Sequence, residues 1–141
     1  MTFFVDANVI IYGAGPTMYG EPGLEVLTAV ASGEADGRTS TAVLEEVWYA
    51  ELSGRIAGLS GLTERALTVF TPLLPVTDEA FRLALALHAP AHLGTNDRLH
   101  IGTCRAHGID TIVSAVSSFD GIRTVRRVDP LDRMAVRRLL G

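Results

Sequence analysis

The sequence predicts an α/β domain in which helices cover both faces of a parallel sheet of about five strands. Short apolar runs alternate with stretches of helical periodicity along the chain, which is the pattern of β-α units. Hydrophobic residues make up 48% of the chain but aromatic residues only 6%, so the core is mostly aliphatic, as expected for strands buried on both faces. With 141 residues and no repeat or linker, we expect one domain over residues 1–141.

The first half of the chain predicts two strands and two helices. An early apolar run predicts a strand over Thr2 to Asp6, and glycine and proline predict a loop from Gly13 to Gly23. Leucine and valine at helical spacing predict a helix from Leu24 to Ala31. A short strand is expected at Arg38-Thr39-Ser40, and it leads into a helix from Thr41 to Ile56.

The second half continues the alternation of strands and helices. Thr77 precedes two acids and an apolar stripe, and Thr95 precedes a second stripe, so both are expected to be helix N-caps. Helices are predicted at Leu62 to Phe70, Thr77 to His88, Thr95 to Gly108 and Leu131 to Leu140. Strands are predicted at Leu74 to Thr77, Thr111 to Ser114 and Arg123 to Val128.

Charge is distributed unevenly along the chain. The net charge is −4, which argues against a generally basic nucleic-acid-binding protein. All 12 basic residues are arginine, and six of them lie in the last 19 positions, where only two aspartates offset them. This segment carries +4 and residues 1–122 carry −8, so we expect a bipolar surface.

The sequence also predicts an intracellular, cytoplasmic protein. Cys104 is the only cysteine, so no internal disulfide is expected, and no thiol or histidine spacing indicates a zinc site. The amino terminus lacks a basic segment and Asp6 interrupts its apolar run, so we expect no secretory signal. The richest apolar stretch elsewhere, Leu83 to Leu87, is too short to span a membrane, and no membrane interaction is expected.

Three acidic residues on separate segments are the candidate metal ligands. Asp6 ends the first predicted strand, and open α/β folds bind ligands at the carboxyl ends of their strands. Glu46 and Asp97 lie near the starts of two predicted helices. A hard divalent cation such as Mg²⁺ or Mn²⁺ needs several carboxylate oxygens, which three such acids would supply. Glu45 points about a quarter turn away from Glu46, so only one of the two is expected to be a ligand.

Each of these acids also has a purely structural interpretation. Asp6 fits the N-cap of a following short helix, Asp97 complements a helix dipole, and Glu46 on a helix is a typical solvated side chain. His100 lies three residues after Asp97 on the same helical face, but a structural role is favoured for it. The combination of three acids, rather than any one of them, indicates a metal site.

Four segments of the sequence together resemble the PIN domain family and, within it, the VapC-type toxins of bacterial toxin–antitoxin pairs. The segments are Phe4-Val5-Asp6-Ala7-Asn8, Ser40 to Glu46, Asp97 to Gly102 and Ile112 to Asp120. They follow the family's order and spacing over nearly the whole chain. The resemblance implies a Rossmann-like three-layer α/β/α sandwich and an endoribonuclease that depends on Mg²⁺ or Mn²⁺. It also implies an RNA substrate, a cognate antitoxin that blocks the site, and a homodimer.

The same resemblance implies roles for individual residues. The three acids Asp6, Glu46 and Asp97 would hold a divalent ion that neutralises phosphate charge and activates a water for in-line attack. The residues that would support the site, by orienting a ligand or a bound water, are Asn8, Ser40 and Ser114.

The sequence departs from the family pattern at one position. The last segment of the family reads Ser or Thr, any residue, then Asp, whereas here Val116 follows Ser114-Ala115. A valine cannot bind a cation, so reduced metal affinity and reduced activity are expected. Asp120, four residues further on, is the possible substitute for the missing fourth acid.

Two other functions remain open at this point. A PIN-like module disabled by Val116 would bind RNA or antitoxin without cutting. A magnesium-dependent phosphatase with an aspartyl nucleophile usually needs a second Asp two residues after the first, and Asn8 occupies that position. Cutting by the Val116→Asp chain, and not by the unchanged chain, would identify a lost acid.

Overall fold

The fold is a parallel four-stranded sheet with helices on both faces. The computed structural model describes residues 1–141, and its strands are β1 (Thr2–Val5), β2 (Asp36–Arg38), β3 (Thr111–Val113) and β4 (Arg126–Val128). The helices are α1 (Ala7–Gly13), α2 (Gly20–Ala31), α3 (Thr41–Ser53), α4 (Leu62–Phe70), α5 (Asp78–Leu85), α6 (Thr95–Ala106), the 3₁₀ helix η1 (Ser117–Gly121) and α7 (Arg133–Leu140). The predicted α/β class is confirmed.

The order of the strands reverses in the middle of the sheet. The order is β2-β1-β3-β4, and every neighbouring pair is parallel. The chain therefore leaves β1 toward β2 on one side and later returns to β3 on the other. In open parallel sheets such a reversal leaves a crevice at the carboxyl ends of the two strands, where ligands bind. Here the reversal lies between β1 and β3, and we refer to the region at the carboxyl ends of these two strands as the crevice.

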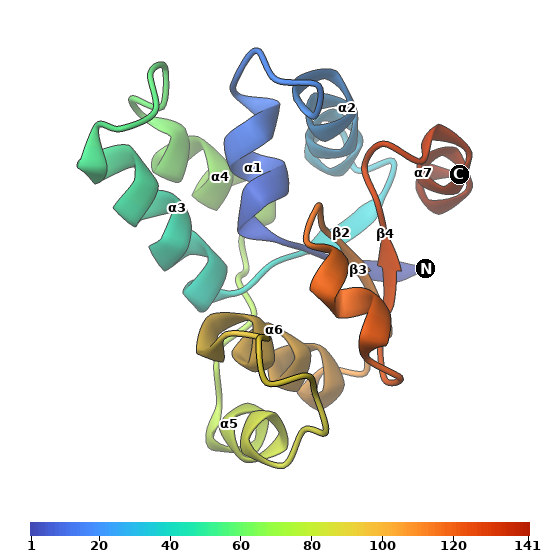
Figure 1. The fold of residues 1–141 in the computed structure, drawn as a ribbon. Coiled ribbons are helices and arrows are strands. Elements are labelled where there is room, and N and C mark those ends of the chain that lie inside the picture. The colour runs from blue at the N-terminus through green and yellow to red at the C-terminus, as the bar shows by residue number, and fades with distance from the viewer.

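The helices form a layer on each side of the sheet. Figure 1 shows α1 and α2 above the sheet, and α6 with α5 below it. α7 packs along α2, and α3 packs against both α1 and α4. α5 and α6 approach closely because Gly102 has no side chain: a Cβ there would lie 2.2 Å from the carbonyl oxygen of Ala80. The predicted three-layer α/β/α arrangement is confirmed.

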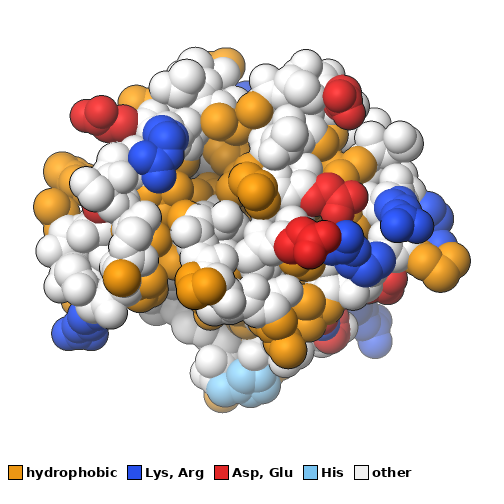
Figure 2. Space-filling view, turned by 90° about the horizontal axis from the view of Figure 1, so that it is seen from above, with side chains coloured by type: hydrophobic (Ala, Val, Ile, Leu, Met, Phe, Trp, Pro, Cys, Tyr) orange, Lys and Arg blue, Asp and Glu red, His pale blue; other side chains and the backbone are white.

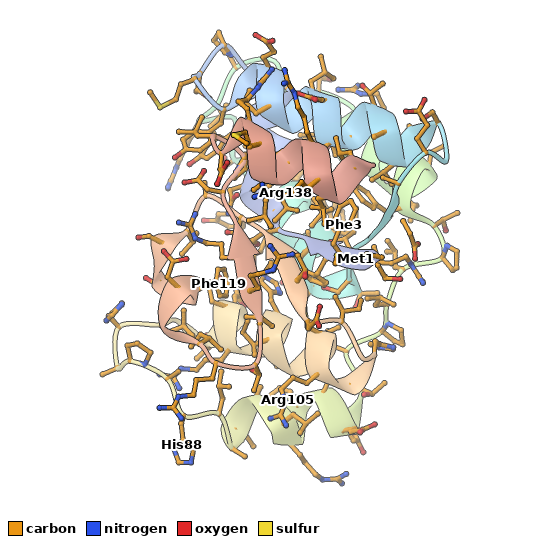
Figure 3. All side chains as sticks on the ribbon, turned by 90° about the vertical axis from the view of Figure 1, so that its right-hand side faces the viewer. Met1, Phe3, His88, Arg105, Phe119 and Arg138 are labelled. Carbon is orange, nitrogen blue, oxygen red and sulfur yellow. The ribbon has the colours of Figure 1, made fainter.

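The core is apolar and runs through the sheet. Phe3 and Phe4 of β1 and Ile112 of β3 have no exposed surface. Phe119, which lies on η1, is also fully buried, and Figure 3 labels it there and Phe3 on β1. Burial on both faces explains why the central strands β1 and β3 are nearly continuous apolar runs, whereas the edge strands β2 and β4 carry charged residues. No helix in the structure combines the length and apolar character needed to span a membrane.

Four strands form rather than five, because the strand predicted at Leu74 to Thr77 is absent. Leu74 makes one isolated parallel bridge, to Ser40, just beyond the end of β2. The pairing does not continue, because Ser40 is the N-cap of α3 and the partner segment turns into this helix at Thr41. The second and last strands form with shifted bounds, since β2 begins at Asp36 and β4 at Arg126.

Several helix boundaries differ from those predicted. α2 begins at Gly20 instead of Leu24, so it takes up the end of the predicted loop. α3 ends at Ser53 instead of Ile56 because Gly54 adopts a left-handed conformation, with φ of 67°. α4 has the predicted bounds.

Candidate active site

Asp6 lies at the carboxyl end of β1, where the chain turns into α1. Its Oδ1 accepts a hydrogen bond from the N–H of Ala7 at 2.8 Å, which makes Asp6 the N-cap of α1. Its Oδ2 accepts from the Ser114 hydroxyl at 2.7 Å and from the Asn8 amide at 2.9 Å. Asp6 is 2% exposed. The structural interpretation as a cap is therefore correct, and the cap also fixes a buried carboxylate in the crevice.

Asn8 and Ser114 connect Asp6 to the end of β3. The Nδ2 group of Asn8 lies 3.2 Å from Ser114 Oγ, and its Oδ1 accepts from the N–H of Ala115 at 3.0 Å. Ser114 Oγ in turn accepts from the N–H of Val116 at 3.0 Å. These bonds hold the two strand ends together and fix the orientation of Asp6, which is the kind of contact that supporting residues make.

Asp97 enters the crevice from the first turn of α6. Burial raises its pKa from the ordinary 3.8 to about 6, the charges of Asp6 and Glu46 add to the rise, and His100 opposes it. One ligand atom from each of Asp6, Asp97 and His100 lies within 4.8 Å of the other two. Asp97 is thus a half-buried acid whose charge nearby protein groups do not fully compensate.

Glu46 reaches the crevice from α3 and meets the ring of His100. The distance from His100 Nε2 is 2.8 Å to Glu46 Oε1 and 3.7 Å to Asp6 Oδ1. His100 is fully buried, whereas the Glu46 side chain is 30% exposed. Burial alone would lower the pKa of His100, but the bond to Glu46 and the charges of Asp6, Glu46 and Asp97 raise it above the ordinary value.

The structure thus brings the three predicted acids into one neighbourhood: Asp6 caps α1, Asp97 lies in the first turn of α6, and Glu46, in the second turn of α3, reaches them through His100. Their role as metal ligands stays a prediction. Glu45 is exposed on α3, as expected if only one of the two glutamates belongs to the site. Ser40 does not contact the acids: it is buried and caps α3 by accepting from the N–H of Val43 at 3.1 Å.

His100 is the member of this cluster that the sequence reasoning placed among structural residues. The signal for it was its spacing of three residues from Asp97, which puts both side chains on one face of α6. The bond to Glu46 depends on how α3 and α6 come together, and no local pattern shows that.

The donors in the crevice fit a hard divalent cation. The three acids offer carboxylate oxygens, which are the ligand atoms that Mg²⁺ and Mn²⁺ prefer. Neighbouring arginines do not neutralise them: Arg98 donates to two backbone carbonyls of the preceding loop, and Arg127 pairs with two other acids. Burial is the main cause of the raised pKa of Asp97, and the charges of Asp6 and Glu46 raise it further; a bound divalent cation would favour the ionised carboxylate.

Val116 and Asp120 do not add an acid to the cluster. The Val116 side chain is half-buried and packs against the apolar core, just before η1. Asp120 lies on η1, is exposed, and accepts two hydrogen bonds from Arg127, at 2.8 and 3.1 Å, which lower its pKa. Asp120 therefore serves a different contact from the one proposed for a substitute ligand.

Two hollows flank this part of the molecule. An open pocket of about 520 Å³ adjoins Glu46, and its lining includes Tyr49 and Asn96. An apolar groove of about 300 Å³ lies between α1, α2 and α4, and its lining includes Leu24 and Leu27. Figure 2 looks onto the face that carries this groove and shows hydrophobic side chains gathered around a hollow there.

Comparison with known proteins identifies relatives of the fold. The family model of the PIN domain matches residues 3–129. FitAcB from Neisseria gonorrhoeae has a TM-score of 0.73 and 18% identity, covering 92% of this chain and 99% of that chain. A toxin–antitoxin complex from Klebsiella pneumoniae has a TM-score of 0.64 and 18% identity, covering 90% and 96%. The sarcin–ricin loop cleaving toxin VapC20 of Mycobacterium tuberculosis has a TM-score of 0.63 and 22% identity, covering 88% and 98%. No curated protein matches the sequence significantly.

Proposed function

The chain belongs to the PIN domain family, and from that premise we propose that it is a divalent-metal-dependent endoribonuclease, the toxin of a toxin–antitoxin pair. The observation that carries the proposal is the grouping of Asp6 and Asp97 with His100 within 4.8 Å, at the carboxyl ends of β1 and β3, and the contact of Glu46 from α3 with this group through His100. Among the structural neighbours, one is a toxin–antitoxin complex and another is a toxin that cleaves the sarcin–ricin loop. These neighbours support RNA as the substrate of this chain.

The three acids would hold Mg²⁺ or Mn²⁺. When bound, such an ion neutralises phosphate charge and lowers the pKa of a water that attacks in line. Asp6 is the most firmly held of the three, because Ala7, Asn8 and Ser114 all donate to its carboxylate. Its burial strengthens electrostatic attraction to a cation, since the interior screens charge less than water does.

The open pocket beside Glu46 gives the RNA a place to lie next to the acids. Tyr49 on its lining is 68% exposed, and an exposed aromatic ring is a typical stacking surface for an unpaired base. Asn96, also on the lining, offers an amide that can donate to and accept from a base edge. Single-stranded or looped RNA is therefore the favoured substrate class.

A cleavage assay tests this proposal. The purified chain is incubated with structured and single-stranded RNA, with Mn²⁺, with Mg²⁺, or with a chelator. We expect cleavage with either metal, none with the chelator, and none from Asp97→Asn. Cleavage that persists in the chelator or in Asp97→Asn would contradict the proposed site.

A second candidate function is a PIN module that binds RNA without cutting it. The observations that favour it are Val116 in place of an acid and the engagement of Asp120 by Arg127. It predicts RNA binding without cleavage by the unchanged chain under every metal condition. Cleavage by Val116→Asp would then identify the missing acid as the cause.

We also propose an antitoxin partner that covers the apolar groove between α1, α2 and α4. An exposed apolar groove of this kind is typical of an interaction site. Leu24 lines it and is 55% exposed, and Phe81 on α5, 50% exposed, lies outside it. An antitoxin that inhibits the nuclease should lose affinity for Leu24→Glu and keep it for Phe81→Glu. The homodimer implied by the family resemblance is tested by light scattering of the purified chain.

A further inference from the structure

His100 sits between two of the candidate ligands, and its ring can take one of two roles there. It either binds the metal through Nε2 or uses Nε2–H to hold the Glu46 carboxylate. We infer that His100 is a positioning residue: it donates from Nε2 to Glu46 Oε1, holds this carboxylate at the acidic cluster, and is not itself a metal ligand. The inference rests on the proposed function, since it assigns a role at the same site.

Glu46 has no other contact that would hold its side chain in the crevice. Its carboxylate lies at the end of a flexible chain, is 30% exposed, and makes hydrogen bonds and ion pairs only with His100. Asp6, by contrast, accepts from three donors. Without His100, Glu46 would gain rotamer freedom by turning to solvent, away from the two other acids.

The ring of His100 is well suited to this task because the surrounding side chains enclose it. It is fully buried, and it packs against the ring of Phe4 with 5.7 Å between ring centroids. It lies one turn after Asp97 on α6, so this helix carries both an acid of the cluster and the ring that bonds to Glu46. The position of Glu46 is therefore fixed relative to Asp97 by one rigid group.

The second ring nitrogen decides between the two roles. Nδ1 of His100 is buried and has no hydrogen-bond partner. A histidine that binds a metal through Nε2 carries its proton on Nδ1, and almost always donates it to a carboxylate, a carbonyl or a water. Here that proton would be buried without an acceptor, which is costly. In the neutral ring, which forms above the raised pKa of His100, a proton on Nε2 is used in the 2.8 Å bond to Glu46, and Nδ1 then carries only a lone pair and needs no acceptor.

Nuclear magnetic resonance of protein with ¹⁵N-labelled histidine tests the position of the proton. Spectra are recorded without metal and with Mg²⁺, and His100 is assigned by comparison with His100→Gln. We expect a proton on Nε2 in both states, and a shift of its resonance in Glu46→Gln. A bare Nε2 with the proton on Nδ1 in either state, or no response to Glu46→Gln, would overturn the inference. The metal-free spectra decide the point even if the chain neither binds metal nor cuts RNA.

Mn²⁺ affinity, measured by calorimetry, tests the consequence. His100→Leu removes the donor, whereas His100→Gln keeps an N–H with similar reach. We expect His100→Leu to lose about tenfold in affinity and His100→Gln to retain most of it. His88→Gln is the matched control, since His88 is exposed and lies away from the sheet in Figure 3. Equal large losses in both His100 variants would identify a ligand, and no loss in either would remove the positioning role.

These outcomes separate the inference from the proposed function. If the unchanged chain binds no Mn²⁺, the proposed metal site fails while the metal-free spectra still test the bond to Glu46. If His100→Leu does not fold, the spectra and His100→Gln remain, and a large loss of affinity in His100→Gln would by itself contradict the inference.

Discussion

Arg127 holds Asp120 with two hydrogen bonds, 2.8 Å from Nε to Oδ1 and 3.1 Å from Nη2 to Oδ2. The same guanidinium donates to the carbonyl oxygen of Ser114 at 2.9 Å and lies 3.3 Å from Asp129. It therefore ties η1 to the end of β3, directly beside the crevice. A paired Arg–carboxylate contact of this geometry is specific, so Asp120 holds the loop after β3, and we expect that it is not a substitute metal ligand.

Asp120→Asn should therefore leave metal binding unchanged. We expect a Mn²⁺ affinity equal to that of the unchanged chain within the error of calorimetry. Because the Asp120 side chain is 58% exposed, loss of the ion pair should lower the free energy of unfolding by only about 0.5 kcal/mol. A large loss of Mn²⁺ affinity without a matching loss of stability would show that Asp120 is a ligand after all.

Asn8→Ala should weaken metal binding through Asp6. The change removes the amide that donates to Asp6 Oδ2 at 2.9 Å and the acceptor for the N–H of Ala115. We expect about a tenfold loss of Mn²⁺ affinity, as for other residues that orient a ligand. We also expect a loss of about 1 kcal/mol in the free energy of unfolding, measured with urea. Asn96→Ala is the control, since Asn96 is the only other asparagine and is exposed.

An Asn8→Ala chain with unchanged Mn²⁺ affinity and lowered stability would assign Asn8 to the fold alone. Equal losses of affinity in Asn8→Ala and Asn96→Ala would point instead to a general effect of removing polar groups near the crevice.

The sequence predicted the parts of the fold that depend on local patterns. The helix at Leu62–Phe70 has the predicted bounds, and the strand ending at Asp6 lies where the apolar run placed it. The strand predicted at Leu74 to Thr77 was wrong: Leu74 forms a single bridge, to Ser40, because the partner segment turns into α3 directly after it. Which segment lies beside Leu74 depends on the tertiary structure, and the local sequence does not show it.

The candidate site divides in the same way between local and tertiary information. Asp6 and Asp97 were found because one ends a strand and the other begins a helix, and both positions are visible in sequence. The hydrogen bond between His100 and Glu46 joins residues 54 positions apart, so no spacing predicts it. Ser40 was predicted to support the site, but its hydroxyl oxygen accepts a hydrogen bond from the backbone N–H of Val43, as expected for an N-cap.

The raised pKa of Asp97 predicts that the metal-free protein loses stability as pH rises from about 4 to 6. Between the ordinary pKa of 3.8 and the folded value of about 6, the folded chain binds more protons than the unfolded chain, so the free energy of unfolding falls with pH. Asp97 is only half-buried, and solvent screening reduces the effect to on the order of 1 kcal/mol. His100, whose pKa is also raised, adds a further fall above the ordinary histidine value of 6.5.

Urea unfolding in a chelator over this pH range measures the effect. Asp97→Asn should be more stable than the unchanged chain above pH 6. Its free energy of unfolding should also lack the fall that the titration of Asp97 causes between pH 4 and 6. Added Mn²⁺ should stabilise the unchanged chain increasingly as Asp97 ionises, because only the carboxylate binds a cation. Stability of the metal-free chain that rises between pH 4 and 6 would contradict the assignment.

Val116→Asp should restore a ligand at the position where the chain departs from its family. Position 116 directly follows the end of β3 that Ser114 and Asn8 tie to Asp6, so a carboxylate there starts close to the crevice. We expect tighter Mn²⁺ binding and faster RNA cleavage, since an added carboxylate supplies a hard ligand that valine lacks. Val116→Asn is the control, because the asparagine side chain has nearly the same shape as aspartate and carries no charge.

The competing expectation for Val116→Asp comes from packing. The Val116 side chain is half-buried against the apolar core, and an Asp that stayed there without a partner would lower the free energy of unfolding by about 1–3 kcal/mol. Thermal melts with and without Mn²⁺ distinguish the two. A lost ligand predicts a Val116→Asp chain that melts earlier than the unchanged chain without metal and gains more from Mn²⁺. A Val116→Asp chain that melts early and gains nothing from Mn²⁺ would establish Val116 as an ordinary core residue. Weak RNA cleavage by the unchanged chain would then not be due to Val116.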